Sequence, residues 1–263
     1  MKPKISIIIP CYNTEDTLDE TLNSVLEQDF KSWEAIIIND GSPDDVEKVA
    51  LKWEKKDSRF KYFKKSNGGL GTARNFGIQK SQGEFILPLD SDNKIKSNFA
   101  SKAISIFNAK ADIGVIYGDA LYFGDKDGRW SVGNFNPIAL LEANYIDACA
   151  LYRKTLYDET KGYDSNLPYQ GHEDWDFWLQ VIHTNYKFYY MKAITFDYRV
   201  KQDSMIRSFT VDMERENIAY IMNKHYKLYL EYYPKLYAMY KSIQIESNKS
   251  IKERLIRKLK RLY

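Results

Sequence analysis

The chain has 263 residues, of which 44% are hydrophobic and 29% are charged, enough for one large α/β domain with an extension or for two small domains. A net charge of only +3 argues against a protein that binds nucleic acid through its whole surface. Cys11 and Cys149 lie far apart without metal-site spacing, so we expect buried thiols in a cytoplasmic protein. No segment has the length of a signal sequence or of a membrane span.

Short apolar runs alternate with segments of helical periodicity over the first hundred residues. This pattern predicts strands over residues 5–9, 33–38, 60–63 and 85–89. It predicts helices over residues 14–28, 44–54 and 70–80. Alternation of this kind predicts an α/β fold with a doubly wound, mostly parallel sheet.

Polar residues follow the ends of the predicted strands. Tyr12 and Asn13 follow the first strand, Asp40 follows the second, and Asp90 and Asp92 follow the fourth. Ligands of such sheets bind at the carboxyl ends of the strands near a switch point, so we expect these side chains in one crevice. Two carboxylates spaced one residue apart suit Mg²⁺ or Mn²⁺. The same Asp-Ser-Asp triplet is also common in ordinary strand-ending turns, and both interpretations stay open on the triplet alone.

The pattern changes after residue 110. We predict short strands over residues 115–117, 120–123, 188–191 and 194–198, an apolar segment over 147–152, and a helix over 172–184. A turn is expected at residues 125–128. Beyond Val211 the chain becomes helical and rich in tyrosine, with an interruption at Pro234. We therefore expect a catalytic domain of residues 1–210 and a helical extension of residues 211–263.

Five segments, in this order and spacing, resemble the motifs of glycosyltransferase family 2, the inverting nucleotide-sugar transferases of GT-A fold. They are Ile-Ile-Pro-Cys-Tyr-Asn (8–13), Ile-Ile-Asn-Asp-Gly-Ser (37–42), Asn-Gly-Gly-Leu-Gly-Thr-Ala-Arg-Asn-Phe-Gly (67–77), Asp-Ser-Asp (90–92) and Gly-His-Glu-Asp-Trp-Asp-Phe-Trp (171–178). Residues 204–207 also resemble the family's flexible segment near the donor. The resemblance implies that residues 1–110 bind the donor and residues 111–210 the acceptor. It implies transfer from a nucleotide-sugar, with a UDP-sugar expected, to a glycan or lipid-linked acceptor in surface polysaccharide or glycoconjugate biosynthesis.

The resemblance assigns the donor pocket to the first strand ends. Asp40 would accept a hydrogen bond from the uracil ring, although Asn-Asp-Gly-Ser alone also fits a plain turn. Pro10, Tyr12 and Asn13 would form the other wall, where Tyr12 packs on the base or is an ordinary partly buried tyrosine. Ser91 is assigned to the donor as well.

The resemblance places Arg74 near the donor pyrophosphate or base, where a planar guanidinium suits an anion; a structural ion pair is the alternative. It implies that Asp92 is the direct ligand of Mn²⁺ or Mg²⁺, with Asp90 nearer the ribose and a metal-bound water. Residue 93 is Asn, where many relatives have an acidic residue, so the ligand set stays open.

The pair Glu173-Asp174 matches the base motif of the family. Inverting transfer needs a carboxylate that takes the proton from the acceptor hydroxyl, and we assign Asp174 as this base, with Glu173 orienting the acceptor or Asp174. The alternative is ordinary helix chemistry, because acidic residues are favoured in a first turn. Asp176 is expected on the wrong side of the helix to share the task. The three histidines show no metal-ligand spacing.

Residues 249–263 contain seven basic residues and a single acidic one. Their apolar residues form one helical stripe, which predicts peripheral contact with an anionic membrane at the inner face of the cell. A solvated helix that packs this stripe on the domain fits equally well, and the oligomeric state stays open. Two other functions are also open: a nucleotidyltransferase of related α/β design, and a catalytically silent relative that binds nucleotides.

Overall fold

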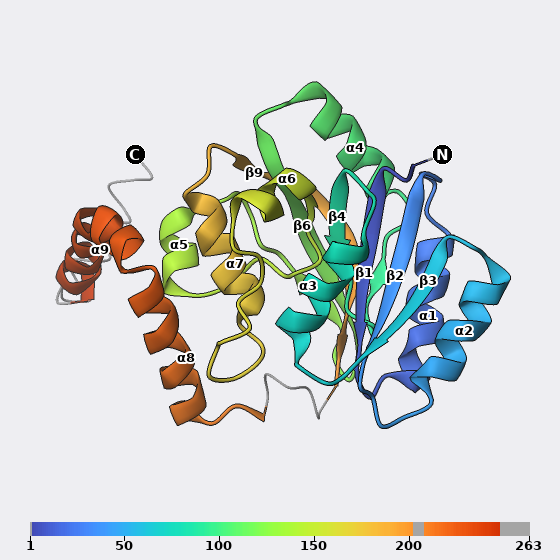
Figure 1. Cartoon of the computed structure of the whole chain (residues 1–263). Helices are drawn as coiled ribbons and strands as arrows, with labels where there is room; N and C mark the ends of the chain where they lie inside the picture. Colours follow the sequence, from blue (N-terminus) through green and yellow to red (C-terminus); the bar gives the residue numbers. More distant parts are fainter. Residues whose placement is uncertain (1, 202–207, 248–263) are drawn as a thin grey trace. The chain divides into compact units, whose positions relative to one another are not determined.

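The computed structural model describes residues 2–201 and 208–247 (Figure 1). The segment 204–207, expected near the donor, and the basic tail 249–263 lie outside these residues. The chain divides into two compact units, Met1–Ile221 and Met222–Tyr263. The first unit contains the sheet and all the residues expected at the active site, and the domain limits expected at residues 110 and 210 stay predictions.

Strands and helices alternate through most of the chain. The strands are β1 (Ile5–Cys11), β2 (Trp33–Asp40), β3 (Phe60–Lys65), β4 (Phe85–Pro88), β5 (Lys94–Ile95), β6 (Ile113–Gly124), β7 (Gly128–Trp130), β8 (Leu151–Arg153) and β9 (Lys187–Val200). The helices are α1 (Glu15–Leu26), α2 (Val46–Lys56), α3 (Leu70–Lys80), α4 (Phe99–Ala109), α5 (Pro137–Glu142), α6 (Lys154–Glu159), α7 (Glu173–Ile182), α8 (Val211–Lys224) and α9 (Tyr226–Ser247).

The described strands form one sheet in the order β3-β2-β1-β4-β8-β6-β9-β5, with β7 paired to β6. The strands β1 to β4 pair in parallel, whereas β8 pairs antiparallel with both β4 and β6. The predicted α/β fold is therefore confirmed, with a parallel first half and a mixed second half. Because the chain steps from β1 out to β3 and returns to β4, the switch point lies between β1 and β4.

Helices cover both faces of the parallel half. Ile5, Ile7 and Ile9 of β1 enter a core shared with buried residues of α1, α2 and α4. The opposite face packs on α3: a Cβ atom at Gly77 would lie 2.7 Å from Cγ2 of Ile8. Glycine at this position lets α3 approach β1 and β2 closely, which brings the start of α3 near the strand ends.

Several boundaries differ from the predictions made on periodicity. The segments 115–117 and 120–123 belong to one strand, β6, and 188–191 and 194–198 belong to one strand, β9. The pairing register of β6 with β9 shifts near Asp119, and Lys192 has a left-handed φ of 54°; these irregularities interrupt the pattern without ending either strand. The helix α4 was not predicted. The predicted interruption at Pro234 is wrong, because α9 runs through it and the break falls at His225.

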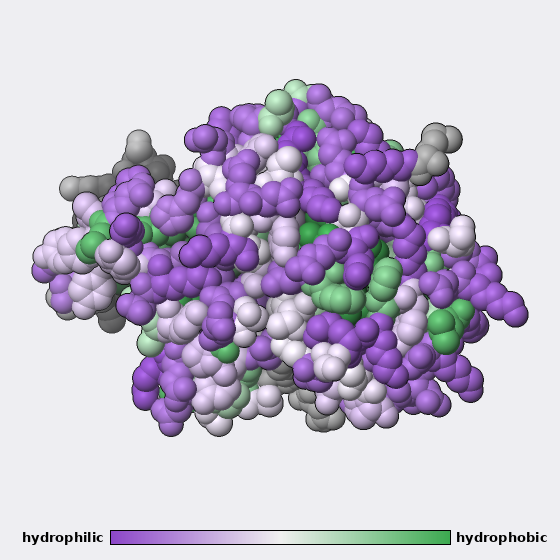
Figure 2. Space-filling view, in the orientation of Figure 1, coloured by the Kyte–Doolittle hydropathy of each residue, from purple (hydrophilic) through white to green (hydrophobic). Residues whose placement is uncertain are grey.

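The surface is mainly hydrophilic on the face drawn in Figure 2, where hydrophobic residues form small separate patches. Among residues 2–201 and 208–247, we find no helix with the length and apolar character needed to cross a membrane.

Candidate active site

The ends of β1, β2 and β4 bring the expected donor residues together. Pro10 is buried in β1, and Tyr12, just beyond this strand, is 54% exposed. Asn13 has a left-handed φ of 56°, and its N–H donates to Oγ of Ser42, 2.7 Å away in the turn after β2. The predicted meeting of the first two strand ends is therefore present in the fold. Contact of these residues with a nucleotide stays a prediction.

Asp40, the last residue of β2, holds the loop that enters α3. Its side chain is almost fully buried, at 3% exposure for the residue, and it accepts hydrogen bonds from the N–H groups of Gly68 (3.1 Å) and Gly69 (2.8 Å). It also forms an ion pair with Lys65. Gly69 has a φ of 85°, a conformation that favours glycine. Asp40 thus organises the loop at the start of α3, a local role close to the turn that its tetrapeptide predicts.

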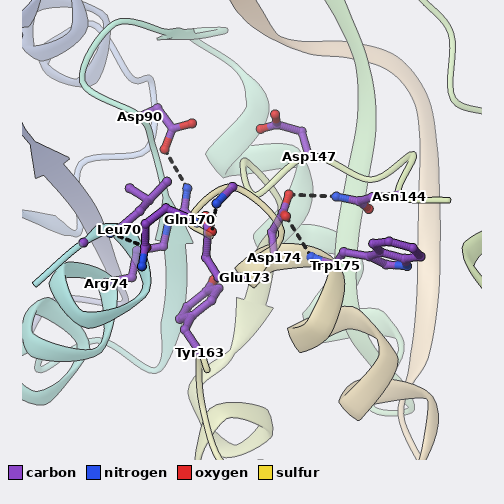
Figure 3. A network of polar contacts seen from close by, with 12 residues as sticks. Leu70, Arg74, Asp90, Asn144, Asp147, Tyr163, Gln170, Glu173, Asp174 and Trp175 are labelled. Atoms are coloured by element: carbon purple, nitrogen blue, oxygen red, sulfur yellow. Dashed lines mark hydrogen bonds and ion pairs between the residues drawn. The ribbon is translucent and has the colours of Figure 1, made fainter. Parts of the chain in front are cut away.

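Arg74 connects two acidic groups that come from distant parts of the chain (Figure 3). Its guanidinium donates to Oδ1 of Asp90 at 2.7 Å and to Oε1 of Glu173 at 2.6 Å. The residue is 1% exposed, and its Nε has no hydrogen-bond partner among the described residues. The ion pair that was the alternative interpretation of Arg74 is therefore formed. It fixes the strand end after β4 against the first turn of α7.

Asp174 lies beside this ion pair, at the start of α7. Its Oδ2 accepts from Nδ2 of Asn144 at 2.9 Å, and its Oδ1 accepts from the N–H of Trp175 at 2.8 Å. Burial and the neighbouring Glu173 raise the pKa of Asp174 well above its usual range. Asp176 is fully buried and accepts from Gln180, so it does not share the position of Asp174. A carboxyl with a raised pKa is suited to accept a proton near neutral pH.

Asp147 lies at the candidate site and was not among the residues predicted from the sequence. Burial, followed by the charge of Asp90, raises the pKa of Asp147 to about 7, and Figure 3 shows its carboxyl group beside Asp90 and Asp174. The predicted site residues follow the carboxyl ends of strands, whereas Asp147 precedes β8. β8 runs antiparallel to β4, with Arg153 opposite Phe85 and Tyr152 opposite Ile86, so the chain just before β8 lies at the same end of the sheet as the chain just after β4. An acidic residue before an antiparallel strand was the available signal.

The two carboxylates after β4 fit a cation that shares its ligands with a substrate. Asp92 is partly buried, its pKa is raised by burial and by Asp90, and Nζ of Lys201 lies 3.4 Å from its Oδ2. Within residues 2–201 and 208–247, no three His, Cys, Asp or Glu side chains form a ready metal site. Two carboxylates from one turn match the usual coordination of Mg²⁺, which binds one or two carboxylates and takes its other ligands from water or substrate oxygens.

The two residues beside these carboxylates serve the fold. Ser91 is buried, and its carbonyl oxygen accepts from Oγ1 of Thr17 at 3.0 Å. Asn93 is 1% exposed, and its Oδ1 accepts from the N–H of Arg199 at 2.8 Å. Asn93 therefore ties the turn after β4 to β9, a structural task that accounts for an amide at this position. The assignment of Ser91 to the donor stays a prediction.

Comparison with known proteins places this geometry in a family. The model of glycosyl transferase family 2 matches residues 6–163. An uncharacterized glycosyltransferase of Rickettsia typhi is 31% identical over 229 residues, which cover 82% of this chain and 67% of the relative. The glycosyltransferase GlyA of Streptococcus pneumoniae is 26% identical over 253 residues, covering 86% of this chain and 36% of GlyA. The chain thus spans about two thirds of the first relative and about a third of the second.

Solved structures support the fold. S. aureus TarS 1–349 in complex with UDP-GlcNAc superposes with a TM-score of 0.65 at 21% identity, over 83% of this chain and 66% of TarS 1–349. A mannosyltransferase of Pyrobaculum calidifontis, in complex with GDP-Man and Mn²⁺, gives a TM-score of 0.59 at 15% identity, over 78% of this chain and 59% of that protein. The fold is the GT-A type, and the chain belongs to glycosyl transferase family 2.

Proposed function

We propose that this glycosyltransferase moves a sugar from a UDP-sugar to a hydroxyl group of a glycan or lipid-linked acceptor, with inversion at the anomeric carbon and with the help of a divalent cation. One observation carries the proposal: Arg74 joins Asp90, at the candidate metal position, to Glu173, which lies next to the candidate base Asp174. The groups needed at the leaving side and at the attacking side of a transfer reaction therefore lie around one arginine.

The donor is expected at the switch point between β1 and β4. This position is where α/β sheets bind nucleotides, and the ends of β1 and β2 meet there through Asn13 and Ser42. TarS is recorded with UDP-GlcNAc, which supports a UDP-sugar, whereas the Pyrobaculum mannosyltransferase is recorded with GDP-Man. GDP is therefore the nucleotide to test against UDP.

Asp92 and Asp90 would hold Mn²⁺ or Mg²⁺. A cation bound there would stabilise the negative charge that develops on the departing nucleoside diphosphate. The Mn²⁺ in the Pyrobaculum mannosyltransferase supports this choice. Arg74 fixes Asp90 through its Oδ1, and the other carboxylate oxygen of Asp90 would contact the cation.

Asp174 acts as the general base. The acceptor oxygen forms a bond to the anomeric carbon and loses its proton to Asp174, while the bond to the diphosphate breaks on the opposite face of the sugar. Asn144 holds one oxygen of Asp174 in place. Glu173 is engaged by Arg74 and by the N–H of Gly171, so its role is to orient this turn and to increase the basicity of Asp174.

The acceptor site and the biological role complete the proposal. We assign acceptor binding to residues 111–210, which supply Asn144, Asp147 and Asp174. A role in surface polysaccharide or glycoconjugate synthesis, and peripheral contact with an anionic membrane through residues 249–263, belong to the same proposal. Loss of vesicle binding on deletion of residues 249–263 would support the membrane contact, and unchanged binding would contradict it.

The experiment is a thermal shift assay with UDP, GDP, dTDP and ADP, each with and without Mn²⁺, followed by a test for sugar release from the matching nucleotide-sugar. A ligand at 100 times its Kd stabilises the folded state by about 2.7 kcal/mol. We expect a Mn²⁺-dependent shift with UDP that Asp92→Ala removes and that Asp158→Ala, at an exposed position in α6, retains. A shift with GDP alone would change the donor, and no shift with any nucleotide would contradict the function.

A further inference from the structure

Asn217 of α8 has a buried side-chain amide that hydrogen-bonds to residues 169–172, the segment just before Glu173 and the candidate base Asp174. The residue has 0% exposure. Its Oδ1 accepts from the N–H of Tyr169 at 2.9 Å, and its Nδ2 donates to the carbonyl oxygen of Tyr169 at 2.9 Å. One side chain therefore pairs with both backbone groups of one residue, as a neighbouring strand would.

The third contact of Asn217 reaches His172, the residue directly before Glu173. Because the pairing with Tyr169 fixes which end of the amide is Nδ2, the contact of Nδ2 with Nδ1 of His172 at 3.0 Å has Nδ2 as its donor. Nδ1 of His172 is then the acceptor, and in the neutral ring the proton lies on Nε2. Nε2 faces Oε1 of Glu214, also in α8, at 3.4 Å. Both N–H groups of the Asn217 amide are thus satisfied.

Residues 169–172 are held by α8 through these contacts. A second set of contacts joins the same residues to the start of α3 and to Glu173. Oε1 of Gln170 accepts from the N–H of Leu70 at 3.0 Å, at the start of α3. The N–H of Gly171 donates to Oε2 of Glu173 at 2.8 Å, and the other oxygen of Glu173 accepts from Arg74. The segment is therefore a short bridge between α8 and the ion pair of the active site.

We propose that Asn217 is a positioning residue for the general base, and that α8 thereby completes the active site. The proposal rests on the proposed function, because it gives Asp174 the role of base. Asn217 itself touches no reacting group: it acts by keeping residues 169–172 in the arrangement that presents Glu173 to Arg74 and Asp174 to the acceptor. Asn217 lies in α8, 43 residues after Asp174 along the chain, so the support comes from a later helix than the one that carries the base.

The test compares Asn217→Ala with Asn223→Ala, an exposed asparagine of the same helix. A displacement of about 1 Å at a reacting group can cost about 100-fold in rate, and we expect kcat for sugar transfer to fall at least about tenfold in Asn217→Ala. The KM for the donor and the Mn²⁺-dependent thermal shift with UDP should stay within twofold of the original values. Asn223→Ala should leave kcat, the KM for the donor and the thermal shift unchanged.

Two further measurements separate positioning from a general loss of structure. Asn217→Asp keeps the size of the side chain and the acceptor for the N–H of Tyr169 but removes both donors; it should show the same fall in kcat, and it serves if Asn217→Ala does not fold. Amide hydrogen exchange over residues 169–176 should become faster in both Asn217 variants and not in Asn223→Ala. Hydrogen exchange does not depend on activity. It therefore tests whether Asn217 holds residues 169–172 even if no donor supports transfer.

The proposal would be overturned by any of three results. These are an unchanged kcat in a folded Asn217 variant, a loss of donor affinity that matches the loss of rate, or unchanged exchange over residues 169–176. If no transfer is detected with any donor but exchange is faster in the Asn217 variants alone, the contacts of Asn217 with residues 169–172 are confirmed and the proposed function is refuted.

Discussion

The buried carboxylates of the sheet differ from those of the candidate active site in how their charge is compensated. In β2, burial acts to raise the pKa of Glu34, but Lys61, Ser6 and the N–H of Gln82 outweigh it and the pKa is lowered. The three partners lie 2.6 Å, 2.7 Å and 2.6 Å from its oxygens, in that order. Glu34 is therefore a stable anion of the framework.

In the candidate active site, burial outweighs the contacts that stabilise the charged form of the carboxyl groups. Burial raises the pKa values of Asp92, Asp147 and Asp174, and in each case a neighbouring carboxylate adds to the effect. Arg74 compensates Asp90 and Glu173 but leaves an excess of negative charge around them. Burial alone therefore does not set the pKa of a carboxyl in this fold. Clustered carboxyls with raised pKa values mark positions where a cation and a proton transfer are expected.

The largest effect is expected for Asp174→Asn, which removes the proton acceptor while it keeps the size of the side chain. General-base catalysis contributes about 10²–10⁴-fold, so kcat should fall by about that factor, and the thermal shift with UDP and Mn²⁺ should persist. Asp158→Asn, at an exposed position of α6, is the matched control. Turnover near the original value in Asp174→Asn would show that the base lies elsewhere.

Arg74→Ala tests how much the stability of the fold depends on the buried guanidinium that joins Asp90 and Glu173. Removing one partner of a buried ion pair destabilises proteins by about 3–5 kcal/mol, and here two carboxylates lose their partner. The measurement is the free energy of unfolding from denaturant titration. Arg215→Ala is the control, since Arg215 is paired with Asp212 but its side chain is 73% exposed, and such pairs contribute about 0–1 kcal/mol. Equal losses in the two variants would contradict the central role of Arg74.

Glu34→Gln tests the framework side of the comparison. We expect a loss of about 1–3 kcal/mol at pH 7, the range for breaking a buried hydrogen-bond network. Since the folded-state pKa of Glu34 lies below the ordinary value of 4.5, its charged form stabilises the fold above that value, and the contribution is lost as the pH falls through the folded-state pKa. The difference in Tm between the two proteins should thus be large at pH 7 and narrow below about pH 4.5. A difference that does not change with pH would refute this account.

Asp147→Asn should act in the opposite direction, with the smallest effect. The folded-state pKa of Asp147 is raised from 3.8 to about 7, so its ionised form penalises the fold; the penalty is absent below pH 3.8, grows as the pH rises and is complete above pH 7. The variant should be more stable at pH 8, and a gain of about 1 kcal/mol would raise Tm by about 2–4 °C. At pH 4 the two proteins should melt at similar temperatures. Destabilisation at pH 8 would show that the hydrogen bond from the N–H of Cys149 to Oδ1 of Asp147, at 2.8 Å, outweighs the penalty on the charge.

Local patterns predicted the parallel half well. Apolar runs identified β1 to β4 and periodicity identified α1 to α3, because a strand buried on both faces and a helix with one buried stripe each show their environment within a few residues. The second half was harder. Its long strands β6 and β9 contain irregularities that look like ends, and α4 is mostly apolar, which weakens the contrast between its faces.

Local sequence patterns were enough to predict the alternation of strands and helices, the polar residues at the ends of β1, β2 and β4, and the acidic pair at the start of α7. Each of these depends on neighbours along the chain. Three features depend instead on the tertiary structure: the ion pair of Arg74 with Glu173, the antiparallel direction of β8 that brings the segment of Asp147 to the end of β4, and the contacts of Asn217 with Tyr169 and His172. These contacts depend on strand direction and helix placement, which are set by the packing of the whole core, so no short segment encodes them.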